Sequence, residues 1–514
     1  MKLFVSIFII LCVLLAAGPG LAQEKAAELK LSLEDCVLLA MEKNLDLAIE
    51  VLEKESADAS VLSSKEKFMP EFSFSITKRD TESASFSWLD ATGEVKTKFS
   101  DYAVEVSQYL PSGGNVSVSL NINRNDTNRN FQTINPRFGS SLSINLSQPL
   151  LKDFGFKMSR REITVAKNNR EMTKSRFKNL VLNTIYNVET AYWNLVYSIE
   201  NLKAQQQSLK LAQDLLAKNK RSVEIGTLAP IEIRSAQAEV ATREAEILEG
   251  RALIENNMDQ LKNILNLGKT DMAKNILPLD KPAFEEKEIK MKEAVELAFK
   301  HRPDLKERKF DIANKKLDLD YARNQVLPDL SLQLSYWSPG VSGTQLVYLD
   351  GNPISGIIID TIPGGSSDAV KDALRLLYPN WSINLALSVP LSSIISRAQV
   401  ARARIGLKQS NLMLENTNKQ VLLEIRTALR NVKTNYKRVL AYRLARELNE
   451  KKLATEIQKL NVGQSTNYNV LQYQRDLAGA RSTELKALID YNLSLANRQK
   501  ILGITCEEKN IKIK

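Results

Sequence analysis

The same succession of elements occurs twice in this chain of 514 residues. Residues 33–70 align without a gap with residues 291–328, and each segment ends in a proline, Pro70 or Pro328. The later matches keep their order: Gln148-Pro149-Leu150 with Val389-Pro390-Leu391, Gly226-Thr227 with Gly463-Gln464, and Leu267-Gly268 with Leu502-Gly503. Such self-similarity indicates a duplicated architecture. It predicts a first repeat over 23–268, a connector over 269–290, a second repeat over 291–503 and a tail over 504–514.

Each repeat carries helices much longer than an ordinary globular domain needs. From Arg160 to Val223 there is neither proline nor glycine, which predicts a helix of about 64 residues, or about 95 Å at 1.5 Å per residue. Apolar residues recur in it at three-to-four spacing, as in packed helices. We expect an antiparallel coiled-coil hairpin over 160–267 and a second hairpin over 392–502.

A glycine marks the turn of each hairpin. Gly226 and Gly463 each follow the end of a long helix, where a left-handed C-cap residue is common. Pro230 suits the first turn of the next helix, and Ser465 or Thr466 suits an N-cap. These turns are therefore the predicted tips of the two hairpins.

Blocks of alternating apolar and small polar residues occupy 70–149 and 328–390. In one of them Val116, Val118 and Leu120 alternate with Ser117 and Ser119. Strands that alternate in this way expose one apolar and one polar face, and blocks of about 9 to 11 residues match the length that crosses a bilayer. Between the blocks, 123–137 and 338–379 are expected to be turns and loops. A soluble sheet is the alternative for the strands alone.

Too few strands are predicted for one chain to close a barrel. A barrel without free edges then needs several chains. A hairpin over 102–122, around Pro111–Gly114, adds two strands, and the sequence leaves open whether it joins the barrel or projects from it. The expected fold is mixed α and β, with a long helical barrel joined to a transmembrane β-barrel that protomers share.

The chain begins with the pattern of a secretory signal peptide over residues 1–22. Lys2 precedes an apolar run, and Gly20-Leu21-Ala22 places small residues where cleavage before Gln23 is expected. Lys and Arg number 71 against 60 Asp and Glu, for a net charge of +11, but the charges are interspersed. This distribution favours a solvated helical surface over a nucleic-acid partner.

Neither catalytic nor cofactor-binding nor metal-binding residues emerge from the sequence. The single histidine, His301, has no metal-ligand spacing around it and is expected on a helix surface. Cys36 and Cys506 remain after cleavage; they either pair, if the chain ends meet, or stay inert thiols. The chain is therefore not expected to be an enzyme.

In this order, the features resemble the TolC-like outer-membrane efflux protein family over about residues 30–505. The resemblance rests on the doubled helix starts at Ala40 and Ala298, the prolines before the first strands, Gln148-Pro149-Leu150-Leu151 and the two Ile/Val-Gly tips. It implies a homotrimer in the outer membrane of a Gram-negative bacterium, with contacts to lipid and a large periplasmic part. It also implies a periplasmic adaptor (membrane fusion) protein, an inner-membrane pump of RND or ABC type that acts through it, and an equatorial position for the connector.

Within this resemblance, the tips are expected to dock the adaptor and to constrict the duct. The expected docking residues are Gly226, Thr227, Leu228, Gly463, Gln464 and Ser465. The candidate residues lining the periplasmic entrance are Glu232, Asn469, Glu239 and Asp476. Because Asn469 and Gln472 stand where the family often has acids, we expect a less acidic entrance with Glu232 as its main carboxylate; a solvated helix charge is the alternative for Glu232.

The sequence does not separate a duct for small-molecule efflux from the exit of a type I protein secretion system. A third hypothesis is a periplasmic structural coiled-coil protein without channel activity, and a soluble enzyme is the most distant one.

Overall fold

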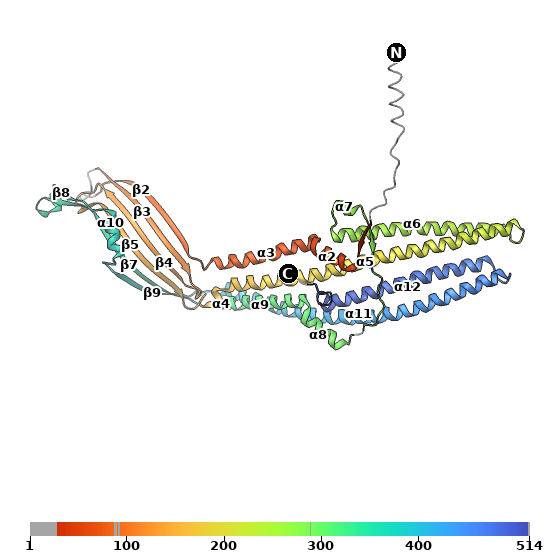
Figure 1. The fold of residues 1–514 in the computed structure, drawn as a ribbon. Helices are drawn as coiled ribbons and strands as arrows, with labels where there is room; N and C mark the ends of the chain where they lie inside the picture. Colours follow the sequence, from red (N-terminus) through yellow and green to blue (C-terminus); the bar gives the residue numbers. More distant parts are fainter. Residues whose placement is uncertain (1–27, 87–89, 91–92, 288, 512–514) are drawn as a thin grey trace, which may run out of the picture. The chain divides into compact units, whose positions relative to one another are not determined.

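The computed structural model describes residues 28–86, 90, 93–287 and 289–511 (Figure 1). The predicted signal peptide lies outside these residues. The chain divides into two compact units. The helical unit comprises the described residues up to Glu53, Thr173–Glu307 and those from Glu415 onward; the sheet unit comprises Lys54–Met172 and Arg308–Leu414. Each unit is thus built from both halves of the sequence, so neither coincides with one sequence repeat.

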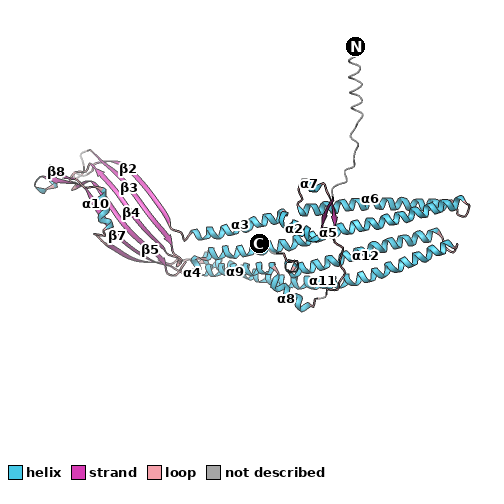
Figure 2. Ribbon diagram, in the orientation of Figure 1, coloured by secondary structure: helices cyan, strands magenta, loops and turns pink. Residues whose placement is uncertain are grey.

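The sheet unit contains a seven-stranded antiparallel sheet (Figure 2). Its strands are β2 (Glu71–Ala84), β3 (Glu94–Tyr109), β4 (Asn115–Thr127), β5 (Ile134–Pro149), β7 (Asp329–Tyr348), β8 (Ile358–Ile362) and β9 (Asn380–Ser388). The order is β2-β3-β4-β5-β7, and β8 and β9 both pair with β7. The hairpin over 102–122 forms parts of β3 and β4, so it lies inside the sheet between β2 and β5.

Most strands are longer than the apolar blocks predicted. The expected turn over 123–137 is wrong at both ends, because β4 continues to Thr127 and β5 begins at Ile134. In this extension Arg124 pairs with Ser100 of β3, and Asn125 pairs with Arg137 of β5. Backbone hydrogen bonds between strands do not require apolar side chains. A strand can therefore continue beyond the residues in which apolar and polar side chains alternate.

The segment 338–379, also expected to be loop, is largely ordered. It contains the end of β7, the short turns η1 (Leu349–Gly351) and η2 (Pro353–Ser355), β8, and the helix α10 (Ser366–Leu374). Helix α10 packs on β7 and β5 through Ala369 and Ala373, which are fully buried. A Cβ atom at Gly340 would lie 1.9 Å from the carbonyl oxygen of Ala369, so this close packing requires glycine on β7.

Helices extend the sheet unit beyond the sheet. They are α4 (Phe156–Ser159), the unit's parts of α3 (Leu45–Glu66), α5 (Arg161–Glu224) and α9 (Pro303–Asn324), and the start of α11 (Ile394–Asn461). Arg161 contacts Asp318 at 2.5 Å and Lys157 contacts Asp320 at 2.6 Å. These ion pairs join the two repeats where their helices run side by side.

The helical unit contains two long hairpins. The first pairs α5 with α6 (Ile231–Leu265), and the second pairs α11 with α12 (Asn467–Leu502). The bounds of α5 differ by one residue from the predicted ones. Smaller elements complete the unit: β1 (Glu28–Leu31), α2 (Leu33–Lys43), α7 (Lys269–Met272), β6 (Asn275–Pro278), α8 (Met291–His301) and α13 (Thr505–Glu508). Among the described helices, none has the length and apolar character needed to cross a membrane.

The connector, residues 269–290, is tied to both hairpins. Its strand β6 pairs in parallel with β1, and the hydroxyl of Tyr192 on α5 donates to Asp280 Oδ2 at 2.9 Å. On the other hairpin, the ring of Phe284 stacks on Tyr436 with centroids 4.9 Å apart. Asn492 Nδ2 donates to the carbonyl oxygen of Ala283 at 3.0 Å. The connector therefore links α5 to α11 and α12.

Candidate functional site

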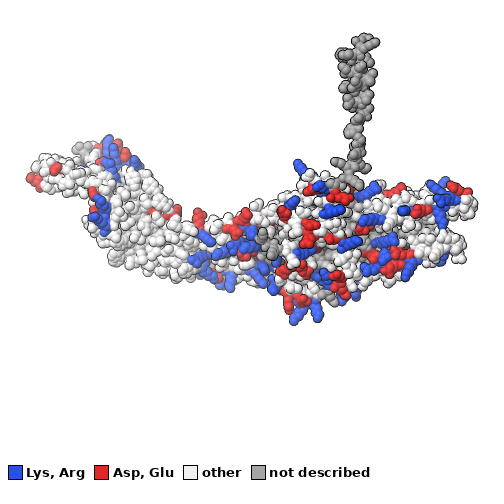
Figure 3. Space-filling view, in the orientation of Figure 1, with Lys and Arg blue, Asp and Glu red and all other residues white. Residues whose placement is uncertain are grey.

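One face of the sheet is a continuous apolar surface. The register places Phe72, Val106, Val118, Ile144, Tyr336 and Trp381 in one row across β2 to β9. The outer members of the row are strongly exposed, Phe72 at 67% and Trp381 at 71%. Figure 3 shows little Lys, Arg, Asp or Glu over the middle of the strands. Exposed apolar patches of this extent are typical of a surface that meets lipid or another protein.

The neighbouring row on the other face is polar across β2 to β5, and it continues with Trp337 on β7. Ser73, Glu105, Ser119 and Ser143 lie side by side in it. One edge of the sheet is β2, and the other edge is formed by β8 and β9, which both pair with β7. It is therefore an open sheet with one apolar face, one polar face and two free edges.

The two hairpin tips have the same backbone geometry. Gly226 and Gly463 both have φ of 77°, a left-handed conformation that glycine adopts without strain. The amide of Thr227 donates to the Ser222 carbonyl at 2.9 Å, and the amide of Gln464 donates to the Lys459 carbonyl at 2.8 Å. Both patterns are the Schellman closure of a helix end, so the duplication extends to the turns.

The tips differ in how the next helix starts. Thr466 caps α12 by accepting from the amide of Asn469, whereas Pro230 precedes α6 without a side-chain cap. Ser465 Oγ donates to Glu456 Oε1 at 2.6 Å. Sequence reasoning missed Glu456, which is buried on α11. An acid close to a helix C-terminus interacts unfavourably with the helix dipole. The position of Glu456 in the sequence therefore indicates that a hydrogen-bond donor lies beside it.

Apolar side chains project from both tips. Ile225, just before Gly226, is 74% exposed, and Val462, just before Gly463, is 70% exposed. The predicted docking residues Gly226, Thr227, Gly463 and Gln464 are also exposed, whereas Leu228 and Ser465 are partly buried. The Ile/Val-Gly phrases were visible in the sequence, but their apolar member was not among the predicted docking residues.

Two of the four predicted entrance residues are carboxylates that basic side chains already pair with. Glu239 lies 2.8 Å from Arg243 and 3.8 Å from Arg475, and only 11% of its side chain is exposed. Asp476 lies 3.8 Å from Lys452. Within the protomer, these pairs offset the negative charge that Glu239 and Asp476 would bring to an entrance.

The other two predicted residues lie nearer the tips. Asn469 is partly buried, and its backbone N–H donates to the side chain of Thr466, the N-cap of α12. Glu232, in the first turn of α6, is partly buried and has no ion pair with any described residue; its backbone carbonyl accepts from Asn219 Nδ2 at 3.4 Å. Of the predicted acids, Glu232 is therefore the one whose charge is not offset by a neighbouring cation.

Polar contacts join the hairpins near these residues. Lys218 Nζ donates to Asn461 Oδ1 at 2.8 Å, and Ser482 Oγ donates to Asn201 Oδ1 at 2.7 Å. A small apolar cluster supplements them, in which Leu215 of α5 meets residues of α11 and α12. Hydrogen bonds of this kind contribute about 1 kcal/mol each, so the contact between the hairpins here is modest.

The remaining candidate residues are structural. His301, expected on a helix surface, instead lies half-buried at the end of α8 with Nδ1 2.7 Å from Glu507 Oε1, because α13 folds back against it. Cys36 and Cys506 are free thiols, both buried in the same apolar cluster. The described residues contain no group of His, Cys, Asp and Glu that could hold a metal ion.

Comparison with known proteins shows a similarity over the first repeat. The model of the family described as "Outer membrane efflux protein" matches residues 37–267. Among curated proteins, no sequence matches the chain.

Solved channels share the fold. The Campylobacter jejuni CmeC outer membrane channel is 18% identical, with a TM-score of 0.65 over 92% of this chain and 85% of that chain. For the Vibrio cholerae outer membrane protein VceC the values are 13% and 0.64, over 92% and 96%. For the open Neisseria gonorrhoeae MtrE channel they are 17% and 0.60, over 92% and 88%. At these identities the likeness shows the fold, and it spans both repeats.

The family match confirms the resemblance that the duplicated motifs indicate. Over residues 37–267 the chain is similar to outer membrane efflux proteins, and over 92% of its length it shares the fold of solved outer membrane channels.

Proposed function

We propose that the protein is the exit duct of a trans-envelope export machine, through which substrates pass passively to the exterior. The machine is a tripartite efflux system or a type I secretion system, in which a periplasmic adaptor and an inner-membrane pump deliver the substrate. The pump would supply the energy, and the similarity of residues 37–267 to outer membrane efflux proteins supports this proposal.

The observation that carries this proposal is the open sheet with its exposed apolar face. A strand edge without a partner leaves backbone groups unpaired, which lipid cannot satisfy. Closure by copies of the same chain, β9 of one against β2 of the next, removes both free edges at once. The apolar row from Phe72 to Trp381 then faces lipid and the row containing Ser119 faces a water-filled lumen. A homotrimer is the assembly we propose.

The first test is the native mass of the mature chain, extracted from outer membranes. A trimer that is recovered only in detergent and conducts ions in a planar bilayer is the expected result. A monomer in the periplasmic fraction that does not conduct would overturn the duct and favour the periplasmic coiled-coil protein, the second candidate function.

The hairpin tips are the proposed docking surface for the adaptor. Their support is geometric, since both present an exposed apolar side chain, Ile225 or Val462, beside a Schellman turn. A partner with apolar pockets would bind both tips alike. Ile225→Asp and Val462→Asp should each abolish substrate export without changing the trimer or its conductance; export at the original rate would exclude the tips as the docking surface.

Glu232 is the proposed charge of the periplasmic entrance. Since Glu239 and Asp476 are paired with cations, Glu232→Gln should weaken block of the single-channel current by divalent cations. Glu239→Gln is the matched control and should change the block much less. An unchanged block in Glu232→Gln would remove this residue from the entrance.

A further inference from the structure

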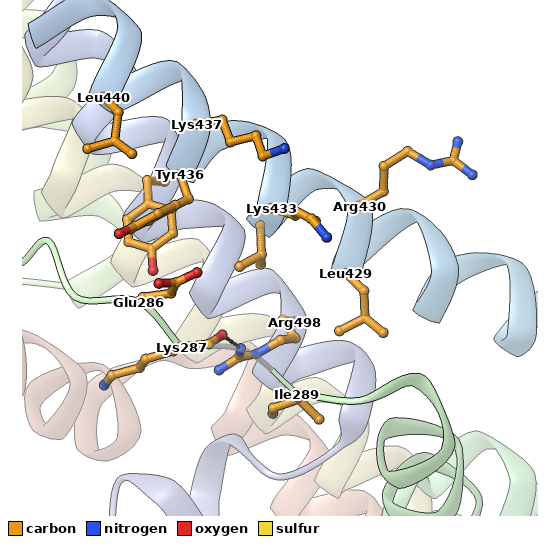
Figure 4. Close-up of a pocket in the computed structure, with 12 residues that line it drawn as sticks. Glu286, Lys287, Ile289, Leu429, Arg430, Lys433, Tyr436, Lys437, Leu440 and Arg498 are labelled. Carbon is orange, nitrogen blue, oxygen red and sulfur yellow. Dashed lines mark hydrogen bonds between the residues drawn. The ribbon is translucent and has the colours of Figure 1, made fainter. Parts of the chain in front are cut away.

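A pocket of about 520 Å³ lies where the connector crosses α11 and α12 (Figure 4). All of its lining residues belong to the helical unit. Its walls are held by the contacts of the connector: the hydroxyl of Tyr491 donates to the carbonyl of Glu285, and Phe284 packs edge-on against Tyr491 at 5.7 Å. A pocket of this volume with fixed walls is in the range of small-molecule sites.

The pocket has an apolar floor and a basic rim. Val432 and Tyr491 are buried in the floor, and Tyr436 lies beside them. Lys433 and Lys437 lie one helical turn apart on α11, both exposed, and Figure 4 shows both beside the opening. Side chains four residues apart share one face of a helix, so the two ammonium groups act on the same ligand position.

Arg498 adds a buried cation to this wall. Its side chain is 3% exposed, and Nη1 donates to the carbonyl oxygen of Lys287 at 2.7 Å. Its Nε has no hydrogen-bond partner among the described residues, and burial lowers the pKa of the guanidinium. A buried donor without a partner is costly, and an anion in the pocket would compensate it.

The charges around the pocket favour an anion. Arg430 and Lys287 line it together with the three cations above, whereas Glu286 is the one acid among the lining residues that the structure describes. A small inorganic anion would leave the apolar residues of the floor exposed to water. The ligand that satisfies both parts therefore carries an anionic head and an apolar body.

We propose that this pocket binds a single-chain anionic amphiphile, with its carboxylate or phosphate head at Arg498 and Lys433 and its hydrocarbon chain along Tyr436 and Leu440. The limited volume favours one chain over two. Such a site is separate from the proposed duct and from the tips, and it does not depend on either. A free fatty acid and a lysophospholipid share the required chemistry.

The test uses the full mature protein in a non-ionic detergent, with dodecyl phosphate and laurate as separate probes and dodecanol as the neutral probe. Native mass spectrometry and calorimetry should find one saturable site per chain for an anionic probe. Preference for phosphate would indicate a lysophospholipid, and preference for carboxylate a fatty acid. Equal retention of dodecanol, or no saturable binding of either anion, would overturn the proposal.

Variants locate the binding. The double variant Lys433→Gln, Lys437→Gln should weaken binding about tenfold, since the charge contacts of two exposed lysines are removed. The matched control, Lys408→Gln with Lys451→Gln, makes the same charge change elsewhere on α11 and should bind like the parent. Both keep Arg498, so folding is not at risk. Equal affinity in the two double variants would refute the site. Cross-linking of a Lys437→Cys variant to a neighbouring chain would also refute it, because the neighbouring chain would then cover the pocket.

Discussion

Cys36 is a thiol that the fold places beyond easy reach of reagents. It is fully buried on α2, and burial raises its pKa to about 12. Because the thiolate is the reactive form, alkylation of native Cys36 near pH 8 should be slower than that of a peptide thiol by about 1,000-fold. Mass spectrometry of the peptide that contains Cys36, after iodoacetamide treatment of the folded mature chain, measures this.

The exposed tip provides the control for this experiment. A cysteine placed by Thr227→Cys should react at the rate of a free peptide thiol, and urea should bring Cys36 to the same rate. Rapid labelling of Cys36 in the folded protein would show that α2 opens readily.

At this scale, the sequence indicated which residue types stand near the tips but not their partners. Glu239 and Asp476 were expected as entrance residues because they match each other in the two repeats. Their cations include Arg475 for Glu239, a residue of the other hairpin. Such a pair depends on how the hairpins pack, and no local spacing reveals it. The basic pocket at Arg498 was not predicted from the sequence for the same reason, because its lining residues come together only when the connector packs on α11 and α12.

The hairpin turns are elements whose glycines can be tested individually. Gly226→Ala and Gly463→Ala force an alanine into a left-handed conformation, which costs about 1–2 kcal/mol each. The melting temperature of the detergent-solubilised protein should fall in both. No atom lies within 4 Å of a Cβ at either position, so strain is the expected cause rather than a clash.

Gly479, inside α12, should respond in the opposite direction. A Cβ atom added at this position would also have nothing within 4 Å, and alanine is favoured over glycine in a helix by about 1 kcal/mol. Gly479→Ala should therefore raise the melting temperature. A similar drop for Gly479→Ala and Gly226→Ala would contradict the left-handed turn as the cause.

The second hairpin should lose stability in acid. Glu450 accepts from Arg481 at 2.8 Å and from Arg446 at 2.9 Å, and the hydrogen bond from Arg481 lowers the pKa of Glu450. A lowered folded-state pKa gives stability that is present above the unfolded value of about 4.3 and lost as the pH falls through the folded value. Thermal unfolding by circular dichroism across this range should show the loss.

Glu450→Gln should flatten that dependence, because glutamine does not titrate. Glu415→Gln is the control: among the described residues Glu415 has one ion pair, with Lys419 on the same helix, and it is exposed, so the effect of this change should be smaller. Identical pH profiles for the parent and Glu450→Gln would show that this pair does not stabilise the hairpin.

The elements themselves were predictable to different degrees. The absence of proline and glycine delimits α5 to within one residue, because a helix needs no long-range partner to continue. Strand ends were not predictable, since β4 is extended through Thr127 by pairing with β3 and β5. Helix α10 was not predicted, because its segment is rich in glycine and proline. The helix is too short to be stable alone, and its close packing against Gly340 of β7 stabilises it.

For the whole molecule, the two faces of β9 give opposite predictions. Leu385 belongs to the apolar face and Ser382 to the polar one. A lysine on a lipid-facing position near the bilayer centre costs about 2–4 kcal/mol, so Leu385→Lys should reduce the amount of trimer in the outer membrane. Ser382→Lys should keep the trimer and change its ion selectivity. Normal trimer yield with Leu385→Lys would show that this face does not meet lipid.

The pairing of β5 with β7 has a consequence for the order in which the chain folds during export. Strand β5 precedes the entire first hairpin and the connector, and its partner β7 follows them. As the chain is exported N-terminus first, β2 to β5 can form a meander before β7 has been exported. Until then, the edge of β5 that pairs with β7 has no partner. Long-range pairing is slow, and a bare edge invites wrong partners. We therefore expect the first repeat to need protection of this edge until the second repeat has been exported.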